Sequence, residues 1–262
     1  MKSMTYLRIY IDMLDNISIN NFCDVSSSLR KMNPISKILC VLIFLILTFV
    51  DNSIQFNFIL SIILIVAMLL SNISFKIYFK ILLSLSPFII FIFLINFLCH
   101  TSINTSIILS LRLIFIVLYS SILTLTTTKE ELIYGLEHIL SPLKIFKVPV
   151  NSLALILTLA ISFIPVVFET LKKIIKCYET RGISFKNLSF SLKISYIKSI
   201  IIPVFIKTFK CADNLSDTMY LKLYNSNSTR TDFYNYGYSK MDAYMLSLHF
   251  MLIIILIMKG IY

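Results

Sequence analysis

Glycine, proline and charged residues are scarce in this 262-residue chain, and tryptophan is absent. With 4 Gly and 6 Pro, few positions interrupt regular structure, which predicts long helices. A transmembrane barrel would need alternating strands of about ten residues, whereas the apolar residues here form continuous runs. The composition therefore favours an all-α chain and excludes a barrel.

Motifs that carry chemistry are missing as well. The chain has no Gly-rich phosphate loop, which excludes an ATPase within this polypeptide, and it has neither an HExxH nor a GxSxG motif. Its histidines, His100, His138 and His249, are scattered singly, as structural histidines usually are. The 5 Cys are odd in number and form no CxxC pair, so we expect neither a disulfide framework nor a metal site. The sequence thus predicts a non-catalytic chain without a cofactor.

Long hydrophobic runs are abundant. Hydrophobic residues make up 58% of the chain, against about 45–50% in soluble domains. A membrane-spanning helix needs about 20 mostly apolar residues, and five runs approach or reach that length. We therefore predict a polytopic integral membrane protein with about five transmembrane helices, at Ile35 to Val50, Ile54 to Leu70, Ile81 to Leu98, Ile103 to Leu125 and Ala243 to Met258.

The distribution of Lys and Arg sets the predicted topology. The connections 51–53 and 100–102 lack both residues and are predicted to be external, whereas the turn 74–80 carries Lys76 and Lys80 and is predicted to be cytoplasmic. After four spans the chain returns to the cytoplasm near Thr128. Residues 129–240 hold most of the positive charge, which favours a cytoplasmic location for this insert.

Two runs within that insert are ambiguous, Val150 to Phe168 and Leu188 to Ile206. Both are apolar, but each contains a proline and continues into a lysine-rich helix. If the first run crossed the membrane alone, the cations from Lys172 to Arg181 would lie outside, against the positive-inside rule. If both runs crossed as a pair, the stretch between them, with its cations from Lys172 to Lys186, would still lie outside. We therefore assign both to a cytoplasmic domain that rests on or dips into the membrane.

Four parts follow from this topology. Residues 1–34 are a polar cytoplasmic segment in which we find no signal peptide. Residues 35–128 form a four-helix transmembrane domain, residues 129–240 a cytoplasmic coupling-helix domain, and residues 241–262 the final transmembrane helix. We expect a multi-pass protein of the plasma membrane with its N-terminus and coupling domain in the cytoplasm.

Three helices are predicted in the insert. Thr128 and Glu131 have the spacing of a capping box, and Ser141-Pro142 ends the short helix that they begin. The second helix opens near Pro149, is expected to kink at Pro165, and ends at Arg181, with Gly182 suited to a left-handed C′ position. The third helix, with a kink expected at Pro203, runs to about Leu223 and is stopped by Asn225 to Ser228.

Each of the two long helices ends in a lone cation, Arg181 or Lys222. A cation in the last turn complements the helix macrodipole by about 0.3–1 kcal/mol, which explains a single case. Two matched endings in one insert favour a second explanation, in which each cation docks into a carboxylate-lined groove of a partner. Both explanations stay open on the residues alone.

Four stretches together resemble the transmembrane T component of energy-coupling factor (ECF) transporters, which are ABC-type importers of vitamins and of cobalt or nickel ions. No single stretch is highly specific, but their order and spacing are similar to the family's from about Leu29 to Tyr224. They are Leu29 to Lys37 at the entry to the first span, Glu131 to Pro142 with Val148-Pro149-Val150, Ile161 to Pro165, and Tyr178 to Gly182, which resembles an Ala-Arg-Gly signature.

The resemblance implies a mechanism and partners. Two ABC ATPases would bind the ends of two crossed coupling helices, and the chain would transmit ATP-driven movement to a separate substrate-binding membrane (S) subunit. ATP would be bound by the partner ATPases. The residues implied in ATPase coupling are Thr180, Arg181 and Gly182 at one helix end and Leu221, Lys222 and Leu223 at the other.

The chain departs from the family pattern at these sites. The second signature carries Lys222 where the family has Arg, so the charge is kept but the bidentate fork is lost. Thr180 replaces a small Ala, and Ser162 replaces a commonly basic residue. The change to Lys222 concerns the strength or geometry of one ATPase contact, and the change to Thr180 is mild.

The net charge of +11 is consistent with retention by anionic membrane lipid, at roughly 1 kcal/mol per basic residue near the surface. Nucleic acid is a poor alternative partner because the cations are dispersed and no nucleic-acid-binding motif accompanies them.

The main alternative function is a stand-alone secondary transporter. That class places ionisable residues near the bilayer midplane, and Arg112 is the exception within otherwise nearly uncharged spans; an Arg snorkelling to the interface explains it.

Overall fold

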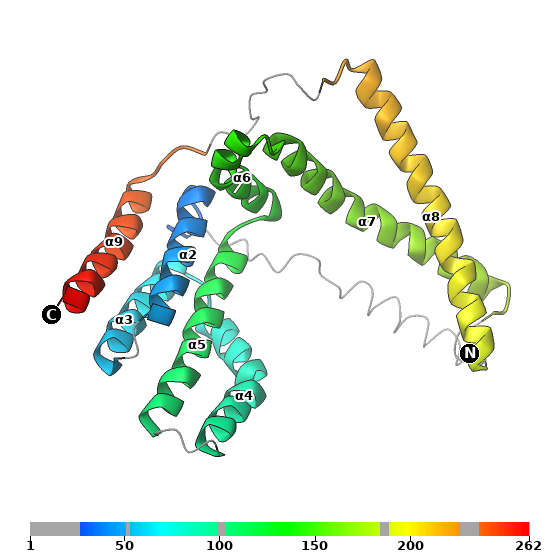
Figure 1. Ribbon diagram of the computed structural model, residues 1–262. Coiled ribbons are helices and arrows are strands. Elements are labelled where there is room, and N and C mark those ends of the chain that lie inside the picture. The colour runs from blue at the N-terminus through cyan, green and yellow to red at the C-terminus, as the bar shows by residue number, and fades with distance from the viewer. Residues whose placement is uncertain (1–26, 51–52, 99–102, 184–188, 226–235, 262) are drawn as a thin grey trace. The chain divides into compact units, whose positions relative to one another are not determined.

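A computed structural model describes residues 27–50, 53–98, 103–183, 189–225 and 236–261. It confirms the all-α prediction, because these ranges contain helices and no strand (Figure 1). The predicted N-terminal segment, 1–34, lies mostly outside the described residues. In chain order the helices are α2 (Pro34–Val50), α3 (Ile54–Ser71), α4 (Phe75–Leu98), α5 (Ile103–Thr126), α6 (Lys129–Ile139), the 3-10 helix η1 (Ser141–Phe146), α7 (Val150–Thr180), α8 (Phe190–Leu221) and α9 (Lys240–Ile261).

The described helices fall into two compact units. The bundle unit contains α2 to α6, η1 and α9, and the helix-pair unit contains α7 and α8. Short α6 thus packs with the bundle, although the sequence assigns it to the coupling domain that starts at residue 129. The four predicted parts are defined by their side of the membrane, and they stay predictions.

Apolar side chains from α2, α3, α5 and α9 form the core of the bundle unit. Phe44, Leu60 and Leu252 are almost completely buried there, and Phe44 stacks on Tyr119 of α5 with ring centroids 4.1 Å apart. Helix α5 contacts α2, α3 and α4, while α6 and α9 pack on α2. Helix α2 therefore joins α5, α6 and α9. Helix α4 lies at the periphery of the bundle, with most of its large apolar side chains exposed.

Five helices of the described chain are long and apolar enough to cross a membrane: α3, Phe75–Asn96 of α4, Asn104–Thr126 of α5, α7, and Lys240–Met258 of α9. Helix α2 has 17 residues, which is slightly short for a span, as the sequence also indicates. Helix α7, which we assign to the coupling domain, is also long and apolar enough to cross a membrane. The chain is a multi-pass membrane protein by these helices.

The turn between the second and third spans is shorter than predicted. Helix α4 begins at Phe75, so Lys76 and Lys80 belong to the helix rather than to a turn over 74–80. The chain reverses earlier, at Asn72, whose backbone is left-handed with φ 53°. Ser71 and Tyr78 then join the two helices through a buried hydrogen bond of 2.9 Å between their hydroxyls.

Asp242 at the start of α9 ties that helix to the start of α2. Its carboxylate accepts hydrogen bonds from the backbone N–H of Asn33 (2.9 Å) and from that of Ser239 (2.5 Å). The Ser239 hydroxyl accepts from the N–H of Met241, which makes a Ser-x-x-Asp cap for α9. The Asn33 side chain in turn donates to the carbonyl of Tyr236 (2.7 Å). Buried backbone groups at this junction are thus satisfied across two helices far apart in sequence.

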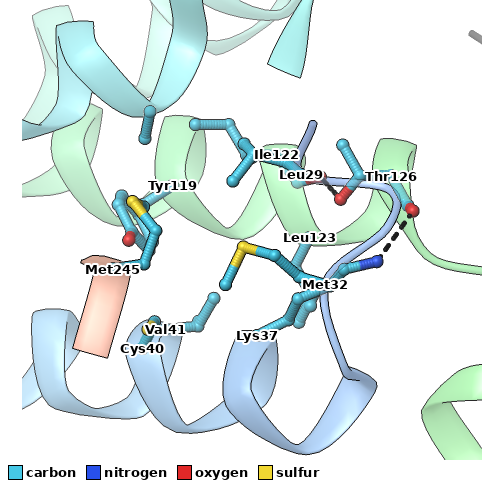
Figure 2. Close-up of a pocket in the computed structure, with 11 residues that line it drawn as sticks. Leu29, Met32, Lys37, Cys40, Val41, Tyr119, Ile122, Leu123, Thr126 and Met245 are labelled. Atoms are coloured by element: carbon cyan, nitrogen blue, oxygen red, sulfur yellow. Dashed lines mark hydrogen bonds between the residues drawn. The ribbon is translucent and has the colours of Figure 1, made fainter. Parts of the chain in front are cut away.

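Lys37 supports the same junction from within α2. Lys37 is 5% exposed, and its Nζ donates to the carbonyl of Arg30 (3.2 Å). It also donates to the carbonyl of Thr126 (3.3 Å), a hydrogen bond drawn in Figure 2. Thr126 is the last residue of α5, so the ammonium lies at the negative end of that helix dipole. Glu131 and Asp242 also interact electrostatically with Lys37. A small cavity of about 30 Å³ adjoins these groups.

Helix α6 packs closely on the start of α2, and Gly135 makes this possible. A Cβ added at Gly135 would lie 2.6 Å from Cδ1 of Ile38 and 3.2 Å from the carbonyl carbon of Pro34. The predicted capping box begins this helix: Glu131 N–H donates to the Thr128 hydroxyl, and Thr128 N–H donates to the Glu131 carboxylate. Ser141-Pro142 ends it, as predicted, and the chain continues as η1.

Gly135→Ala should lower the stability of the bundle unit by about 1–2 kcal/mol, because overpacking against the Pro34 backbone outweighs the helix propensity gained. Thermal unfolding in detergent, followed by circular dichroism, measures this. Gly237→Ala is the matched control, since a Cβ there meets no atom within 4 Å. Adding Ile38→Val, which removes the nearest clashing atom, should restore part of the loss; equal stability of Gly135→Ala and wild type would contradict this packing.

Asp242→Ala should lower stability by about 2–3 kcal/mol, because it leaves the Asn33 and Ser239 N–H groups without their acceptor. The same unfolding measurement applies. Asp213→Ala, which removes an exposed carboxylate from α8, should change stability by no more than about 0.5 kcal/mol. A similar effect of both variants would show that the α2–α9 tie contributes little.

Candidate functional site

The helix-pair unit positions the predicted site residues. Near the end of α7, the Tyr178 hydroxyl donates to the carbonyl of Ser199 on α8 (3.1 Å), and its ring packs edge-on against Tyr196. A small apolar cluster continues from there along both helices. It contains the buried side chains Tyr196, Ile200 and Val204 of α8 and, packed against them, Val167, Leu171, Ile174, Ile175 and Tyr178 of α7.

The two helices run antiparallel. Residues near Tyr178 meet residues near Ser199, while Phe163, earlier in α7, lines a common small cavity with Cys211, later in α8. Pro165 and Pro203 lie inside these helices, and each helix continues through its proline. The kinks expected at the two prolines stay predictions.

The end of α7 is defined by a Schellman motif. The N–H of Gly182 donates to the carbonyl of Glu179 (2.9 Å), and the N–H of Ile183 donates to that of Tyr178 (3.2 Å). Gly182 has φ 78°, so it occupies the left-handed C′ position predicted for it. The last helical residue is Thr180, and Arg181 is therefore the C-cap.

The end of α8 repeats this geometry. The N–H of Leu223 donates to the carbonyl of Tyr220 (2.9 Å), and the N–H of Tyr224 donates to that of Met219 (2.9 Å). Leu223 has φ 56°, and Lys222 is the C-cap. The helix ends before Asn225, so the left-handed turn at Leu223, rather than the Asn/Ser stretch, stops it.

Arg181 and Lys222 thus occupy the same position of the same capping motif. In both cases a cation is followed by a residue in the left-handed conformation. Glycine adopts that conformation freely, whereas leucine adopts it at a cost of about 1–2 kcal/mol. Leu223 thus has a strained backbone that an Asn or Gly would relieve, and its side chain is almost fully exposed.

Both helix ends are open to contact. Arg181 and Lys222 are exposed, and within the part of the chain that the structure describes neither forms an ion pair. Large apolar side chains surround Lys222: Tyr220 is 82% exposed, Leu221 77% and Leu223 89%. Next to Arg181, Gly182 leaves open space on its Cβ side. The α8 end is therefore an apolar tip with one cation, and the α7 end presents an exposed cation next to a glycine.

The C-terminal ends of α7 and α8, which carry the two cations, lie at opposite ends of the helix pair (Figure 1). Arg181 follows Tyr178, which touches Ser199, whereas Lys222 lies about 23 residues farther along α8, or about 34 Å at 1.5 Å per residue. The structure therefore groups Thr180, Arg181 and Gly182 at one end and Leu221, Lys222 and Leu223 at the other. One small binding pocket on a partner cannot take both groups at once.

Sequence reasoning missed the left-handed turn at Leu223 and the exposed Tyr220. No sequence signal marks a leucine for φ near 56°, since leucine disfavours that region. The role of Tyr178 in fixing α7 to α8 was also missed. In the described residues no group of three or more His, Cys, Asp or Glu side chains is arranged to hold a metal ion. Cys40, Cys177 and Cys211 are free thiols, and Cys23 and Cys99 lie outside the described residues.

Comparison with known proteins identifies relatives over most of the chain. The family described as CbiQ, Cobalt transport protein, matches residues 25–233. The Energy-coupling factor transporter transmembrane protein EcfT of Brevibacillus brevis is 30% identical over 260 residues, covering 93% of this chain and 98% of the relative. The EcfT proteins of Bacillus subtilis and Staphylococcus aureus are each 29% identical, covering 84% and 93% of this chain and 89% and 97% of the relatives.

The match spans both units, since it includes the bundle helices α2 to α6 as well as α7 and α8 with both capped ends. It bears out the resemblance carried by the residues from Leu29 to Tyr224, and it agrees with the all-α, multi-pass architecture. The chain belongs to the CbiQ cobalt transport protein family, the transmembrane T components of energy-coupling factor transporters.

Proposed function

We propose that this chain is the scaffold of an ECF-type importer and that the capped ends of α7 and α8 each bind one ABC ATPase subunit. The observation that carries the proposal is the matched geometry of Arg181 and Lys222, two exposed C-cap cations at opposite ends of one helix pair. Coupling with two ATPases needs two separate contacts, and a separation of about 34 Å along the helix axis is consistent with that need.

Each end is suited to a groove lined by carboxylates. The fork of Arg181 can pair with a carboxylate through two parallel hydrogen bonds, whereas Lys222 offers a single ammonium. The apolar side chains of Tyr220, Leu221 and Leu223 offset this weaker pairing by burying surface in the groove. At the Arg181 end the partner backbone can approach closely, because Gly182 has no side chain.

The packing between α7 and α8 provides the mechanical link. The Tyr178–Ser199 hydrogen bond and the cluster around Ile200 join the helices, so a displacement of one end is transmitted to the other helix. Large apolar side chains of α8, among them Ile201, Ile202 and Phe205, are exposed on this pair. They offer a surface for the substrate-binding S subunit, which would reorient in the bilayer as the ATPases move.

In the proposed transport reaction this chain catalyses no chemical step. The ATPase subunits bind and hydrolyse ATP, and the S subunit selects a vitamin or a cobalt or nickel ion. The coupling unit and the N-terminus lie in the cytoplasm, as the distribution of Lys and Arg favours. A stand-alone secondary transporter has no comparable support, because neither the family match nor the matched helix ends follow from it.

Arg181→Glu should abolish ATP-driven uptake by the reconstituted complex and weaken binding of one ATPase at least about 100-fold, since charge reversal places two anions in one groove. Membrane insertion should be unchanged. Lys176→Glu, five residues earlier on α7 and also exposed, makes the same change in net charge and should retain most uptake. Unchanged uptake with Arg181→Glu would remove Arg181 from the mechanism.

Lys222→Ala should reduce uptake by only about tenfold, because a single ammonium contact is lost while the apolar tip remains. Lys222→Arg should be tolerated, and Lys210→Ala, an exposed cation elsewhere on α8, is the control. The readout is ATP-driven uptake, compared with the ATPase activity of the same preparation. A larger loss for Lys222→Ala than for Arg181→Ala would reverse the order of the two sites.

A further inference from the structure

The 3-10 helix η1 exposes two large apolar side chains between two cations. Ile145 is 82% exposed and Phe146 77%, while Lys144 and Lys147, on either side of them, are also exposed. No Asp or Glu occurs between Leu140 and Val150. Pro142 fixes the start of this short helix, and Lys147, with φ 61°, reverses the chain at its end. The backbone therefore holds the apolar pair outward in a defined turn.

The exposed apolar surface continues from η1 onto α6. Leu136, Leu140 and Leu143 follow one another by single helical turns, with the N–H of Leu140 bonded to the carbonyl of Leu136 and that of Leu143 to the carbonyl of Leu140. These three side chains are 41%, 41% and 39% exposed. A different side of α6 packs on α2 through Gly135. Helix α6 and η1 together thus form an amphipathic element whose apolar side is partly exposed among the described residues.

The position of α6 in the bundle unit sets its depth relative to the membrane. Gly135 lies against Pro34, the first residue of α2, and α6 begins three residues after Thr126, the last residue of α5. Because α5 is long and apolar enough to cross a membrane and α2 packs beside it, the end of α5 and the start of α2 lie near the headgroups. The exposed side of α6 and η1 is therefore level with the bilayer surface.

We propose that η1 is an interfacial anchor that inserts Ile145 and Phe146 at the boundary of headgroups and acyl chains, while Lys144 and Lys147 bind the phosphates of anionic lipids. Amphipathic elements with a basic polar side and a bulky apolar side bind membranes in this way. The two lysines on a stretch without acidic residues complement an anionic lipid surface. Since α7 starts at Val150, this anchor holds the first residue of α7 at the bilayer. The inference needs only that the bundle spans the membrane, and it does not depend on the coupling role of α7 and α8.

The absence of tryptophan from the chain allows a direct test. Phe146→Trp introduces a single indole into the full-length chain, which is reconstituted without other subunits in vesicles of phosphatidylglycerol and phosphatidylcholine. We expect the indole at position 146 to emit at shorter wavelength than in water and to lose most of its emission when the lipids carry brominated acyl chains. Aqueous iodide should quench it weakly. In vesicles of phosphatidylcholine alone, and with Lys144→Gln and Lys147→Gln added, the quenching by bromine should be clearly smaller.

Two further single-tryptophan variants calibrate the measurement. Phe91→Trp, on an exposed position of α4 within a candidate span, should be quenched fully by brominated lipid. Tyr220→Trp, at the α8 tip, should be quenched by iodide and not by bromine. If the Tyr220→Trp variant were quenched by lipid, the proposed ATPase contact would fail while the anchor would not. If Phe146→Trp does not fold, Ile145→Trp replaces it.

Strong iodide quenching of the Phe146→Trp variant with no effect of brominated lipid would overturn the anchor. An emission shift that occurs only after ATPase or S subunits are added would also overturn the anchor, because η1 would then contact protein rather than lipid. Equal quenching with and without phosphatidylglycerol would also overturn it, since the two lysines would then bind no anionic headgroup.

Discussion

The end of an α-helix leaves carbonyl groups without partners, and this chain solves that problem in the same way at the ends of α7 and α8. In each Schellman motif the two N–H groups that follow the helix satisfy two of these carbonyls, and the chain must then turn through a left-handed residue. That turn leaves the C-cap residue, Arg181 or Lys222, at the extreme tip of a rigid helix. The coupling function that we propose depends on this placement, because a frayed helix end would transmit little force.

The bundle unit supplies a fixed reference for such movement. Buried polar contacts concentrate where α2, α5, α6 and α9 begin or end: Asp242 joins α9 to the residue before α2, and the Lys37 ammonium binds the last carbonyl of α5. Other polar groups are buried elsewhere in the bundle, among them Asn57 and Arg112, and Tyr119 makes a 2.8 Å hydrogen bond with the buried His249. Hydrogen bonds between distant residues therefore hold the bundle together at the end from which α6 leads into α7.

The sequence alone predicted the helices and the capped end of α7, which is one of the two helix ends of the candidate site. Hydrophobic run length predicted α2, α3, α5 and α9, and the Thr128–Glu131 spacing predicted the cap of α6. Gly182 marked the end of α7 because glycine favours positive φ. The matching turn at Leu223 had no such mark, since it depends on hydrogen bonds from Leu223 and Tyr224 rather than on residue preference. Contacts between distant residues, such as Asn33 with Asp242, were also beyond sequence reasoning, although Ser239-x-x-Asp242 has the spacing of a helix cap.

The number of ATPase subunits bound per chain tests the central claim most directly. Native mass spectrometry of the tagged chain, purified in mild detergent with its partners, should give two nucleotide-binding subunits for the unaltered protein. With charge reversal at Arg181 or at Lys222 it should give one, because each end serves a separate subunit. Two bound subunits in both variants, or none in either, would contradict an account in which the two helix ends are independent docking points.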